Sequence, residues 1–167
     1  VINNADLISR HLQAKCAVDE YALMPIGQLR SQDNNNHVNV QGQYWRGLDY
    51  IENCYTLESI ANIEQASDVA SAFAQFTNAL SDFDSENLAE IIPQFHDLSM
   101  RVKQLSQAIA NCSDTIPSKA QATIDFMLSQ QDFIDSVAEI IRELPLRVTH
   151  NDTKINNLLF SKETNKP

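Results

Sequence analysis

Near its end the chain carries four chemically capable side chains at short spacing. They are His150, Asp152, Lys154 and Asn157, within the stretch RVTHNDTKINNLLF. A carboxylate at the centre of a loop can accept the proton of a hydroxyl group, and a lysine two residues later can reach a transferring phosphate. An amide oxygen five residues after the carboxylate can ligate Mg²⁺, which prefers oxygen ligands. The spacing therefore predicts phosphoryl transfer.

The order of these residues matches the catalytic loop of protein kinases, in which His and Asp are followed by Asn five residues after the Asp. We expect His150 to brace the loop from behind by hydrogen bonding to its backbone. The flanking runs Leu146–Thr149 and Leu158–Phe160 are short and apolar, which predicts a small strand on each side. The alternative is that Asp152 and Asn157 are ordinary turn formers, but that interpretation does not explain the flanks.

Two kinds of element precede this loop in the first third of the chain. Apolar residues recur every four positions from Ile8 to Cys16, which predicts a short helix over Ala5–Ala17. Apolar and aromatic runs then surround the polar stretch SQDNNN, whose residues favour turns. They predict an antiparallel β meander with a last tight turn at Gly42 and strands at Leu23–Leu29, Val38–Gln41 and Tyr44–Tyr50.

From Ser67 onward apolar residues repeat at steps of three and four, which predicts about three helices. The first of them presents Val69, Phe73, Phe76, Leu80 and Phe83 on one face. The second runs from about Leu98 to Ile109, and the third continues to Pro145 after Pro117, which suits a first helical turn. We therefore expect an α+β protein with a first region at residues 1–53 and a mainly helical second region at 54–167.

The composition of the chain limits the classes of binding partner and the cellular compartment that we expect. The chain of 167 residues is 43 % hydrophobic, enough for a real core, and its net charge of −10 argues against nucleic acid or an anionic membrane as a partner. Its three cysteines have no C-x-x-C spacing, which favours free thiols in a reducing compartment, and we predict a cytoplasmic protein. No apolar run approaches the roughly 20 residues that span a bilayer. The oligomeric state stays open.

The stretch RVTHNDTKINNLLF resembles the catalytic loop of the aminoglycoside phosphotransferase and choline kinase superfamily, and THNDTKINN is especially similar to N-acetylhexosamine 1-kinases. GQYWRGLDYIEN resembles the last strand and hinge of the N-terminal lobe in that group, and IIPQFHDLSMRV resembles its Pro-x-Phe-His segment. The resemblance covers nearly the whole chain. It implies a protein-kinase-like fold, ATP and Mg²⁺ as cofactors, and transfer of the γ-phosphate to a hydroxyl of a small molecule, such as a sugar.

The resemblance also implies roles for individual residues of the loop. Asp152 would be the catalytic base and would face the acceptor hydroxyl, Lys154 would approach the phosphate, and His150 would brace the loop. Asn157 would ligate Mg²⁺, whereas Asn156 has no fixed role and shapes the turn.

Two further segments receive roles in the same way. The backbone of the hinge residues Asp49, Tyr50, Ile51 and Glu52 is the expected adenine contact. Trp45 could also line an adenine site, although packing within the sheet is the favoured role for this side chain. By resemblance His96 lies near the sugar pocket, and a helix-start or packing role is equally open.

Several parts that a working kinase needs are absent from the sequence. There are only three glycines and no Gly-rich phosphate loop, and no metal-binding Asp follows the catalytic loop. We therefore expect the chain to be an inactive piece of a longer phosphotransferase. The alternative is a non-catalytic interaction module that keeps the loop without the chemistry. A sulfatase is disfavoured because none of the three cysteines lies in a C-x-P-x-R context.

Overall fold

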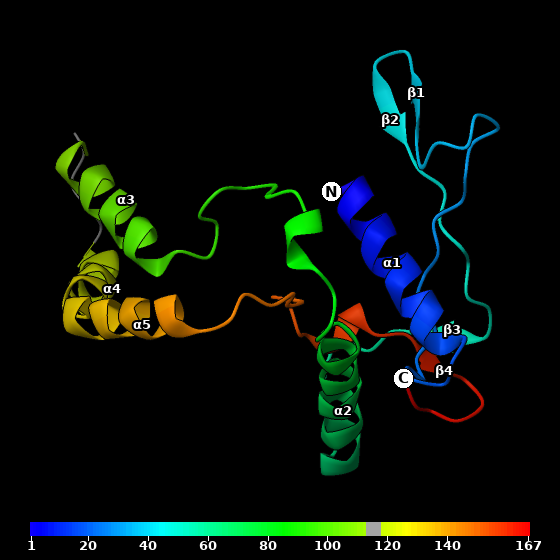
Figure 1. Ribbon diagram of the computed structural model, residues 1–167. Coiled ribbons are helices and arrows are strands. Elements are labelled where there is room, and N and C mark those ends of the chain that lie inside the picture. The colour runs from blue at the N-terminus through cyan, green and yellow to red at the C-terminus, as the bar shows by residue number, and fades with distance from the viewer. Residues whose placement is uncertain (113–117) are drawn as a thin grey trace. The chain divides into compact units, whose positions relative to one another are not determined.

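The computed structural model describes residues 1–112 and 118–167 and shows a mixture of helices and small antiparallel sheets (Figure 1). The protein is thus α+β, as predicted. Contacts divide it into two compact units, one made of Val1–Ala89 with Arg147–Pro167 and the other of Glu90–Leu146. The boundary predicted near residue 53 concerns two lobes and not these contact-based units, and it stays a prediction. The elements of the larger unit are α1 (Ile2–Cys16), β1 (Val38–Val40), β2 (Gln43–Trp45), β3 (Cys54–Tyr55), α2 (Ile63–Ala79), two 3₁₀ turns (Ser85–Asn87 and Ile155–Asn157) and β4 (Phe160–Ser161).

Helix α1 confirms the first predicted helix and begins three residues earlier than expected. Leu12 is buried, as the apolar spacing predicts, but Asp6 is buried as well. The carboxylate of Asp6 accepts hydrogen bonds from Arg10 on the same helix and from Arg30, whose Nη2 lies 2.6 Å from Oδ1 and 2.7 Å from Oδ2. Two guanidinium groups therefore compensate the desolvated charge, and they tie α1 to the chain that follows it.

The predicted three-stranded meander is wrong in its first strand and in the length of its third. The second and third predicted strands pair as β1 and β2, with Val38 opposite Trp45, but β2 ends at Trp45 and does not reach Tyr50. The segment predicted at Leu23–Leu29 contributes a single isolated bridge between Gln28 and Leu48. Pro25 lies in that segment and has no N–H to donate, which disfavours a regular strand. The turn at Gly42 is confirmed, because Gln41 and Gly42 both have positive φ, as two-residue hairpin turns require.

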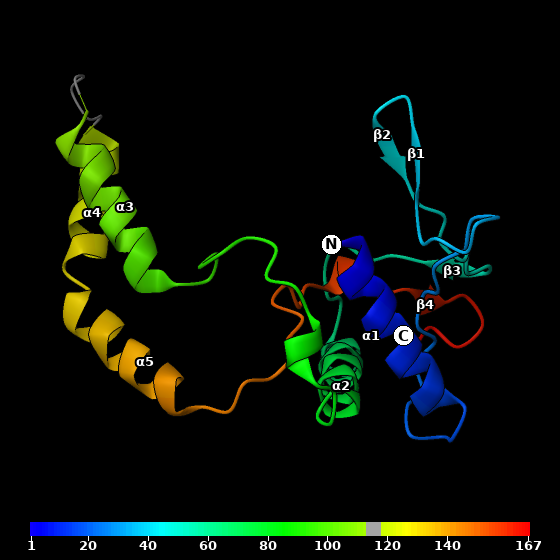
Figure 2. The same cartoon turned by 45° about the horizontal axis from the view of Figure 1, so that its top comes forward.

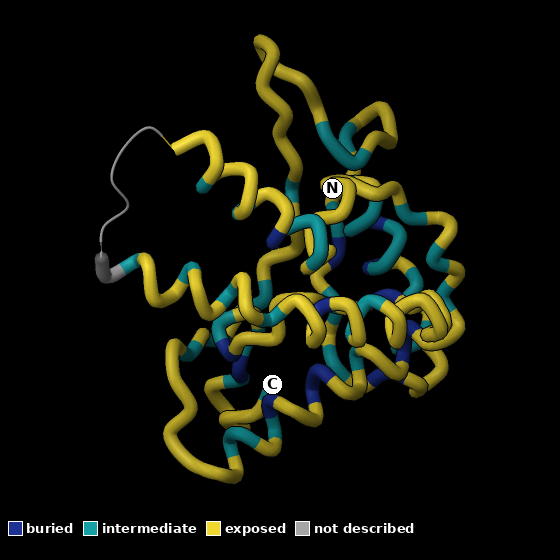
Figure 3. Tube along the Cα trace, turned by 90° about the vertical axis from the view of Figure 1, so that its left-hand side faces the viewer, coloured by how far each residue is buried: buried dark blue, intermediate teal, exposed yellow. Residues whose placement is uncertain are grey.

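The β1–β2 hairpin stands clear of the helices of its unit in both views (Figures 1 and 2). All six of its strand residues are exposed, as the yellow tube in Figure 3 shows. Trp45 is 58 % exposed, so the expectation that it packs within a sheet is wrong. With only two strands the hairpin has no second layer against which an aromatic ring could be buried.

Helix α2 carries the core of the larger unit. The side chain of Asn62 caps it by accepting a hydrogen bond from the Gln65 N–H at 2.8 Å, so the helix begins four residues before the predicted Ser67. Its predicted apolar face is confirmed at Val69 and Phe73, which are buried. Residues of this helix and of the turn after it join two separate apolar clusters. The first cluster contains Leu12, Tyr21, Ala79, Leu80 and Val148, and the second contains Val69, Phe73, Ile155 and Phe160.

A second small sheet joins distant parts of the chain. Strand β3 pairs antiparallel with β4, with Cys54 opposite Ser161 and Tyr55 opposite Phe160. The strand predicted at Leu158–Phe160 is therefore displaced toward the end of the chain, and the one predicted at Leu146–Thr149 is absent from the described residues, where that stretch has irregular backbone. The pairing holds the end of the candidate catalytic loop to the segment that follows the predicted hinge.

The smaller unit contains α3 (Leu98–Ala110), α4 (Ser118–Leu128) and α5 (Gln131–Glu143). The single helix predicted up to Pro145 is thus two helices with a break at Ser129–Gln130. The predicted role of Pro117 lies outside the described residues. Val102 and Ile134 are buried, whereas the large apolar side chains of Phe126 and Phe133 are exposed. In the part of the chain that the structure describes, no helix has the length and apolar character needed to cross a membrane.

Candidate active site

The loop that carries His150, Asp152, Lys154 and Asn157 is anchored from behind by apolar side chains. Val148, Ile155 and Phe160 are buried, and they alternate with exposed polar residues. At the start of the loop the guanidinium of Arg147 donates a hydrogen bond to the backbone carbonyl of Ser81, just after α2. These fixed points hold the backbone, so that the polar side chains between them project from a defined surface.

The chain turns sharply between His150 and Asp152. Asn151 has φ of +59°, in the left-handed region that asparagine tolerates better than most residues. Its side-chain oxygen accepts a hydrogen bond from the Thr149 hydroxyl at 2.6 Å. The tight turn brings the Asp152 N–H within 3.3 Å of His150 Nδ1, which accepts its hydrogen bond. This is the kind of side chain to backbone brace that the sequence predicts for His150.

The ring of His150 is itself held by two aromatic residues of α2. The rings meet edge to face, with centroid distances of 5.3 Å to Phe73 and 5.6 Å to Phe76. Because Nδ1 accepts a hydrogen bond, the neutral ring carries its proton on Nε2. Helix α2 thus sets the orientation of the imidazole, and the imidazole in turn sets the backbone at Asp152.

Asn157 is bound to Asp152 through its amide nitrogen. Nδ2 donates to the backbone carbonyl of Asp152 at 2.7 Å and to its carboxylate oxygen Oδ2 at 2.9 Å. Only the NH₂ group can serve two acceptors in this way, so Oδ1 must occupy the opposite corner of the amide and stays available as a ligand. The hydrogen bond holds the amide nitrogen against the carboxylate, and the amide oxygen on the other side of the group is one of the oxygen ligands predicted for an Mg²⁺-dependent phosphoryl transfer.

The charge on Asp152 is stabilised locally. The hydrogen bond from Asn157, with a further contribution from Lys154, holds the pKa of Asp152 below its ordinary value of 3.8, although partial desolvation acts in the other direction. Lys154 Nζ lies 3.3 Å from Asp152 Oδ2, and more than half of each side chain is exposed. Asp152 is therefore ionised at neutral pH, as a general base must be, and the flexible stem of Lys154 leaves the ammonium free to reorient toward a phosphate.

Asn156 has a different environment from its neighbour. Its Nδ2 donates to the carboxylate of Glu58 at 3.3 Å, and its Oδ1 is buried without a hydrogen-bond partner among the described residues. The contact joins the 3₁₀ turn of the loop to the segment between β3 and α2. This agrees with a role in shaping the turn, which is what the sequence predicts for it.

A hollow of about 830 Å³ connects the loop with the predicted hinge. Its wall contains Ile51 and Glu52 of the predicted hinge, and it also contains His150 and Asn157 of the loop. Asp49, Tyr50, Asp152 and Lys154 do not contribute to its wall. The structure thus brings together half of the predicted hinge and half of the predicted loop around one space.

The hinge segment itself is extended and largely exposed. The Asp49 N–H donates to the Gly27 carbonyl at 3.0 Å, which leaves this amide engaged, and Tyr50 is 88 % exposed. The Ile51 carbonyl accepts a hydrogen bond from the Cys54 thiol at 2.9 Å. No hydrogen bond to the backbone of Glu52 is present within residues 1–112 and 118–167, so these main-chain groups remain available for a heterocycle.

His96 lies in the smaller unit, just before α3. It is exposed, and its ring meets the ring of Phe95 edge-on at 4.9 Å. Asp97 follows it and caps α3 by accepting a hydrogen bond from the Met100 N–H at 2.9 Å. The helix-start environment that the sequence left open is therefore what His96 occupies, and its predicted proximity to a sugar stays a prediction.

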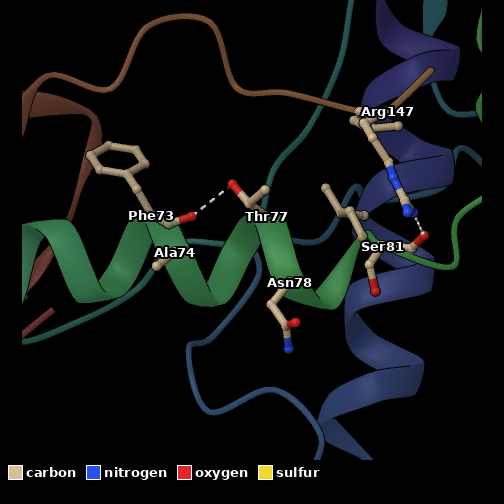
Figure 4. A pocket seen from close by; sticks show the side chains of 8 residues that line it. Phe73, Ala74, Thr77, Asn78, Ser81 and Arg147 are labelled. Atoms are coloured by element: carbon tan, nitrogen blue, oxygen red, sulfur yellow. Dashed lines mark hydrogen bonds between the residues drawn. The ribbon is translucent and has the colours of Figure 1, made fainter. Parts of the chain in front are cut away.

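A second hollow, of about 590 Å³, lies beside the C-terminal half of α2 (Figure 4). Two of its polar side chains are bonded to backbone carbonyls, since the Thr77 hydroxyl donates to Phe73 at 2.9 Å and Arg147 donates to Ser81. Figure 4 draws these bonds as dashed lines. The first hollow is larger and is lined by residues of both the loop and the predicted hinge, so it is the better candidate for a binding site.

Sequence reasoning did not identify the side chains that position the loop. Phe73 and Phe76 were predicted as core, but nothing local shows that they hold His150. The left-handed turn at Asn151 could have been predicted from the residue type, because asparagine tolerates this conformation and favours turns. The described residues contain no cluster of three or more His, Cys, Asp or Glu side chains that could hold a metal by itself. No model of a known protein family matches the chain.

Proposed function

We propose that the protein is an ATP- and Mg²⁺-dependent phosphotransferase with a protein-kinase-like fold, located in the cytoplasm. Its acceptor is a hydroxyl group of a small molecule, and a sugar such as an N-acetylhexosamine is the best candidate. The observation that carries the proposal is the pairing of Asn157 with Asp152. The amide nitrogen is fixed on the predicted base, which turns the amide oxygen away from that base and leaves it open to a metal ion.

Each predicted residue has a role that its surroundings support. Asp152 accepts the proton of the acceptor hydroxyl, because its lowered pKa keeps it ionised. Lys154 neutralises charge on the transferring phosphate, and Asn157 Oδ1 would hold Mg²⁺ together with phosphate oxygens of the nucleotide, which is why no protein cluster of three ligands is required. His150 keeps the Asp152 backbone in place through its hydrogen bond.

The hollow supports a place for the nucleotide base. Its wall contains Ile51 and Glu52, whose main chain is the predicted adenine contact, as well as Asn157. Adenine in this space would leave the phosphates directed toward the loop. The Mg²⁺ supplies charge neutralisation between the phosphates when it is bound.

The test is transfer of labelled γ-phosphate from ATP to N-acetylglucosamine, N-acetylgalactosamine and a panel of other hydroxyl acceptors, measured in the complete gene product that contains these 167 residues. We expect Asp152→Asn to lower kcat by about 10²–10⁴-fold without changing the Kd for Mg²⁺–ATP, since a general base acts on the chemical step. A matched control is Asp33→Asn, the same acid-to-amide change at an exposed residue outside the loop.

Two results would contradict the proposal. If the complete protein neither binds Mg²⁺–ATP nor transfers phosphate, the phosphotransferase assignment fails. Binding of Mg²⁺–ATP without transfer to any acceptor would instead identify the non-catalytic module that the sequence leaves as the alternative.

A further inference from the structure

The core of the larger unit is divided, and the hollow of about 830 Å³ lies where the two parts meet. Leu12 and Tyr21 from the first apolar cluster and Phe73 from the second all line it. A space of this size between two halves of one core is within the range of roughly 300–1,000 Å³ that is typical of small-molecule sites.

The wall of the hollow is apolar over most of its extent. Helix α1 contributes Ile8 and Leu12, the chain at residues 21–26 contributes Leu23, and α2 contributes Ala72 and Phe73. Tyr21 also lines it, and burial raises the pKa of its phenol, as expected in surroundings of low polarity. Such a wall recognises apolar surface and adds little directional bonding.

The carboxylates that line the hollow are those of Glu52 and Glu163, and the polar side chains of His150 and Asn157 line it as well. No lysine or arginine among the described residues lines the hollow. Two carboxylates without a compensating cation repel an anionic group and accept hydrogen bonds from a neutral ligand. The charge pattern therefore disfavours a phosphate inside the hollow, which agrees with nucleotide phosphates outside it at Lys154, and favours an uncharged ligand within it.

We propose that the space between α1 and α2 binds an uncharged, mainly apolar small molecule, with a hydrogen-bond donor of that molecule directed toward the polar side chains of Glu52, His150 and Asn157. The bound molecule joins the two apolar clusters and fixes α1 against α2. This site does not depend on phosphoryl transfer, because its walls, volume and charge are properties of the larger unit alone. It shares the wall at Ile51 and Glu52 with the proposed adenine site, so the two ligands compete.

The test uses two fluorescent probes with the same ring skeleton. N-phenyl-1-naphthylamine is neutral and has one N–H donor, whereas 8-anilinonaphthalene-1-sulfonate adds a single negative charge. We expect saturable binding of the neutral probe to one site, and about tenfold weaker binding of the sulfonate, which corresponds to two weak carboxylate repulsions. Equal or tighter binding of the sulfonate would overturn the proposed selectivity.

A pair of variants on α2 locates the site. Ala72 is 2 % exposed and lines the hollow, whereas Ala70 is exposed on the same helix and does not. Ala72→Met fills part of the space, so we expect it to raise the Kd of the neutral probe by about tenfold or more. Ala70→Met should leave that Kd unchanged within about twofold. Equal effects of the two substitutions would contradict the proposal.

A measurement without any substitution keeps the proposal testable if Ala72→Met does not fold. In isoleucine methyl-labelled protein, the neutral probe should shift the resonances of Ile8, Ile26 and Ile51, which line the hollow, and leave those of Ile140 and Ile141 in the smaller unit unchanged. Shifts confined to the smaller unit would show that its exposed apolar side chains bind the probe instead, and would overturn the inference. Neither measurement contains nucleotide, so its failure leaves the phosphotransferase proposal untouched.

Discussion

The candidate loop and the β1–β2 hairpin are both short, polar and rich in turns, yet they differ completely in how they are supported. The loop at residues 147–160 alternates exposed polar side chains with the buried anchors Val148, Ile155 and Phe160. The hairpin at residues 38–45 has no buried strand residue. Precise chemistry needs side chains whose backbone is fixed from behind, so the comparison favours the loop as the functional element of the larger unit.

The largest expected effect is the loss of the anchor beneath the loop. Phe160 is fully buried between β3 and α2, so Phe160→Ala should lower the free energy of unfolding by about 3–5 kcal/mol. Phe160→Leu is the matched control and should cost roughly 1.5 kcal/mol or less, because most of the volume remains. Urea unfolding measures both, and a loss below about 1 kcal/mol for the alanine variant would show that the loop is not held from behind.

The next effect concerns the ion pair between α1 and the chain leading to the hairpin. Burial acts to raise the pKa of Asp6, but hydrogen bonds from Arg30 and Arg10 outweigh it and hold the pKa below its ordinary value of 3.8. Arg30→Met should therefore lower the free energy of unfolding by about 2 kcal/mol at pH 7, since a buried carboxylate loses a charged donor.

The pH dependence of that loss follows from the lowered pKa of Asp6. The stabilisation is complete above pH 3.8 and disappears as the pH falls through the lower pKa of the folded state. The difference in the free energy of unfolding between the wild type and Arg30→Met should thus shrink below about pH 3.8. Urea unfolding across the acid range measures it. A difference that stays constant down to pH 2 would contradict the role of the charged pair.

A smaller change is expected within the loop itself. Asn157→Ala removes the hydrogen bond that contributes most to the lowered pKa of Asp152, so this pKa should rise toward 3.8. Carboxyl ¹³C NMR titration measures it, with Asn156→Ala as the matched control because that amide contacts Glu58 instead. An unchanged pKa of Asp152 in Asn157→Ala would mean that the two side chains are not coupled in solution.

The smallest effect is expected in the hairpin. Trp45 is 58 % exposed and has no second layer beneath it, so Trp45→Ala should change the free energy of unfolding by about 0.5 kcal/mol or less. Thermal unfolding followed by circular dichroism measures the difference. A loss comparable to that of Phe160→Ala would remove the contrast between the two regions.

The helices and the proximity of Asp152 to Asn157 were accessible from the sequence because both depend on local spacing. The apolar period at Val69 and Phe73 identified the buried face of α2, and the interval from Asp152 to Asn157 matched two side chains that lie within hydrogen-bond distance. The tight turn at Gly42 was likewise encoded in the residues that form it.

Features that depend on distant partners were not accessible. The pairing of Cys54–Tyr55 with Phe160–Ser161 joins segments more than 100 residues apart. Neither segment has an apolar pattern that predicts this partner. The burial of Asp6 could not be predicted from its neighbours, because its partner Arg30 lies 24 residues further along the chain. The three-stranded meander failed for a related reason, since strand formation at Leu23–Leu29 required partners that the fold does not supply.

The most direct test of the central claim is where the metal of a bound nucleotide lies. Mn²⁺ accepts the same oxygen ligands as Mg²⁺ and broadens nearby NMR signals. With Mn²⁺–ATP bound, the amide resonances of Asp152 and Asn157 should broaden in the wild type, while those of Val40 in the hairpin should not, and Asn157→Ala should abolish the effect. Broadening that survives in Asn157→Ala, or that spares the loop, would contradict the assignment of residues 150–157 as the catalytic loop of a phosphotransferase.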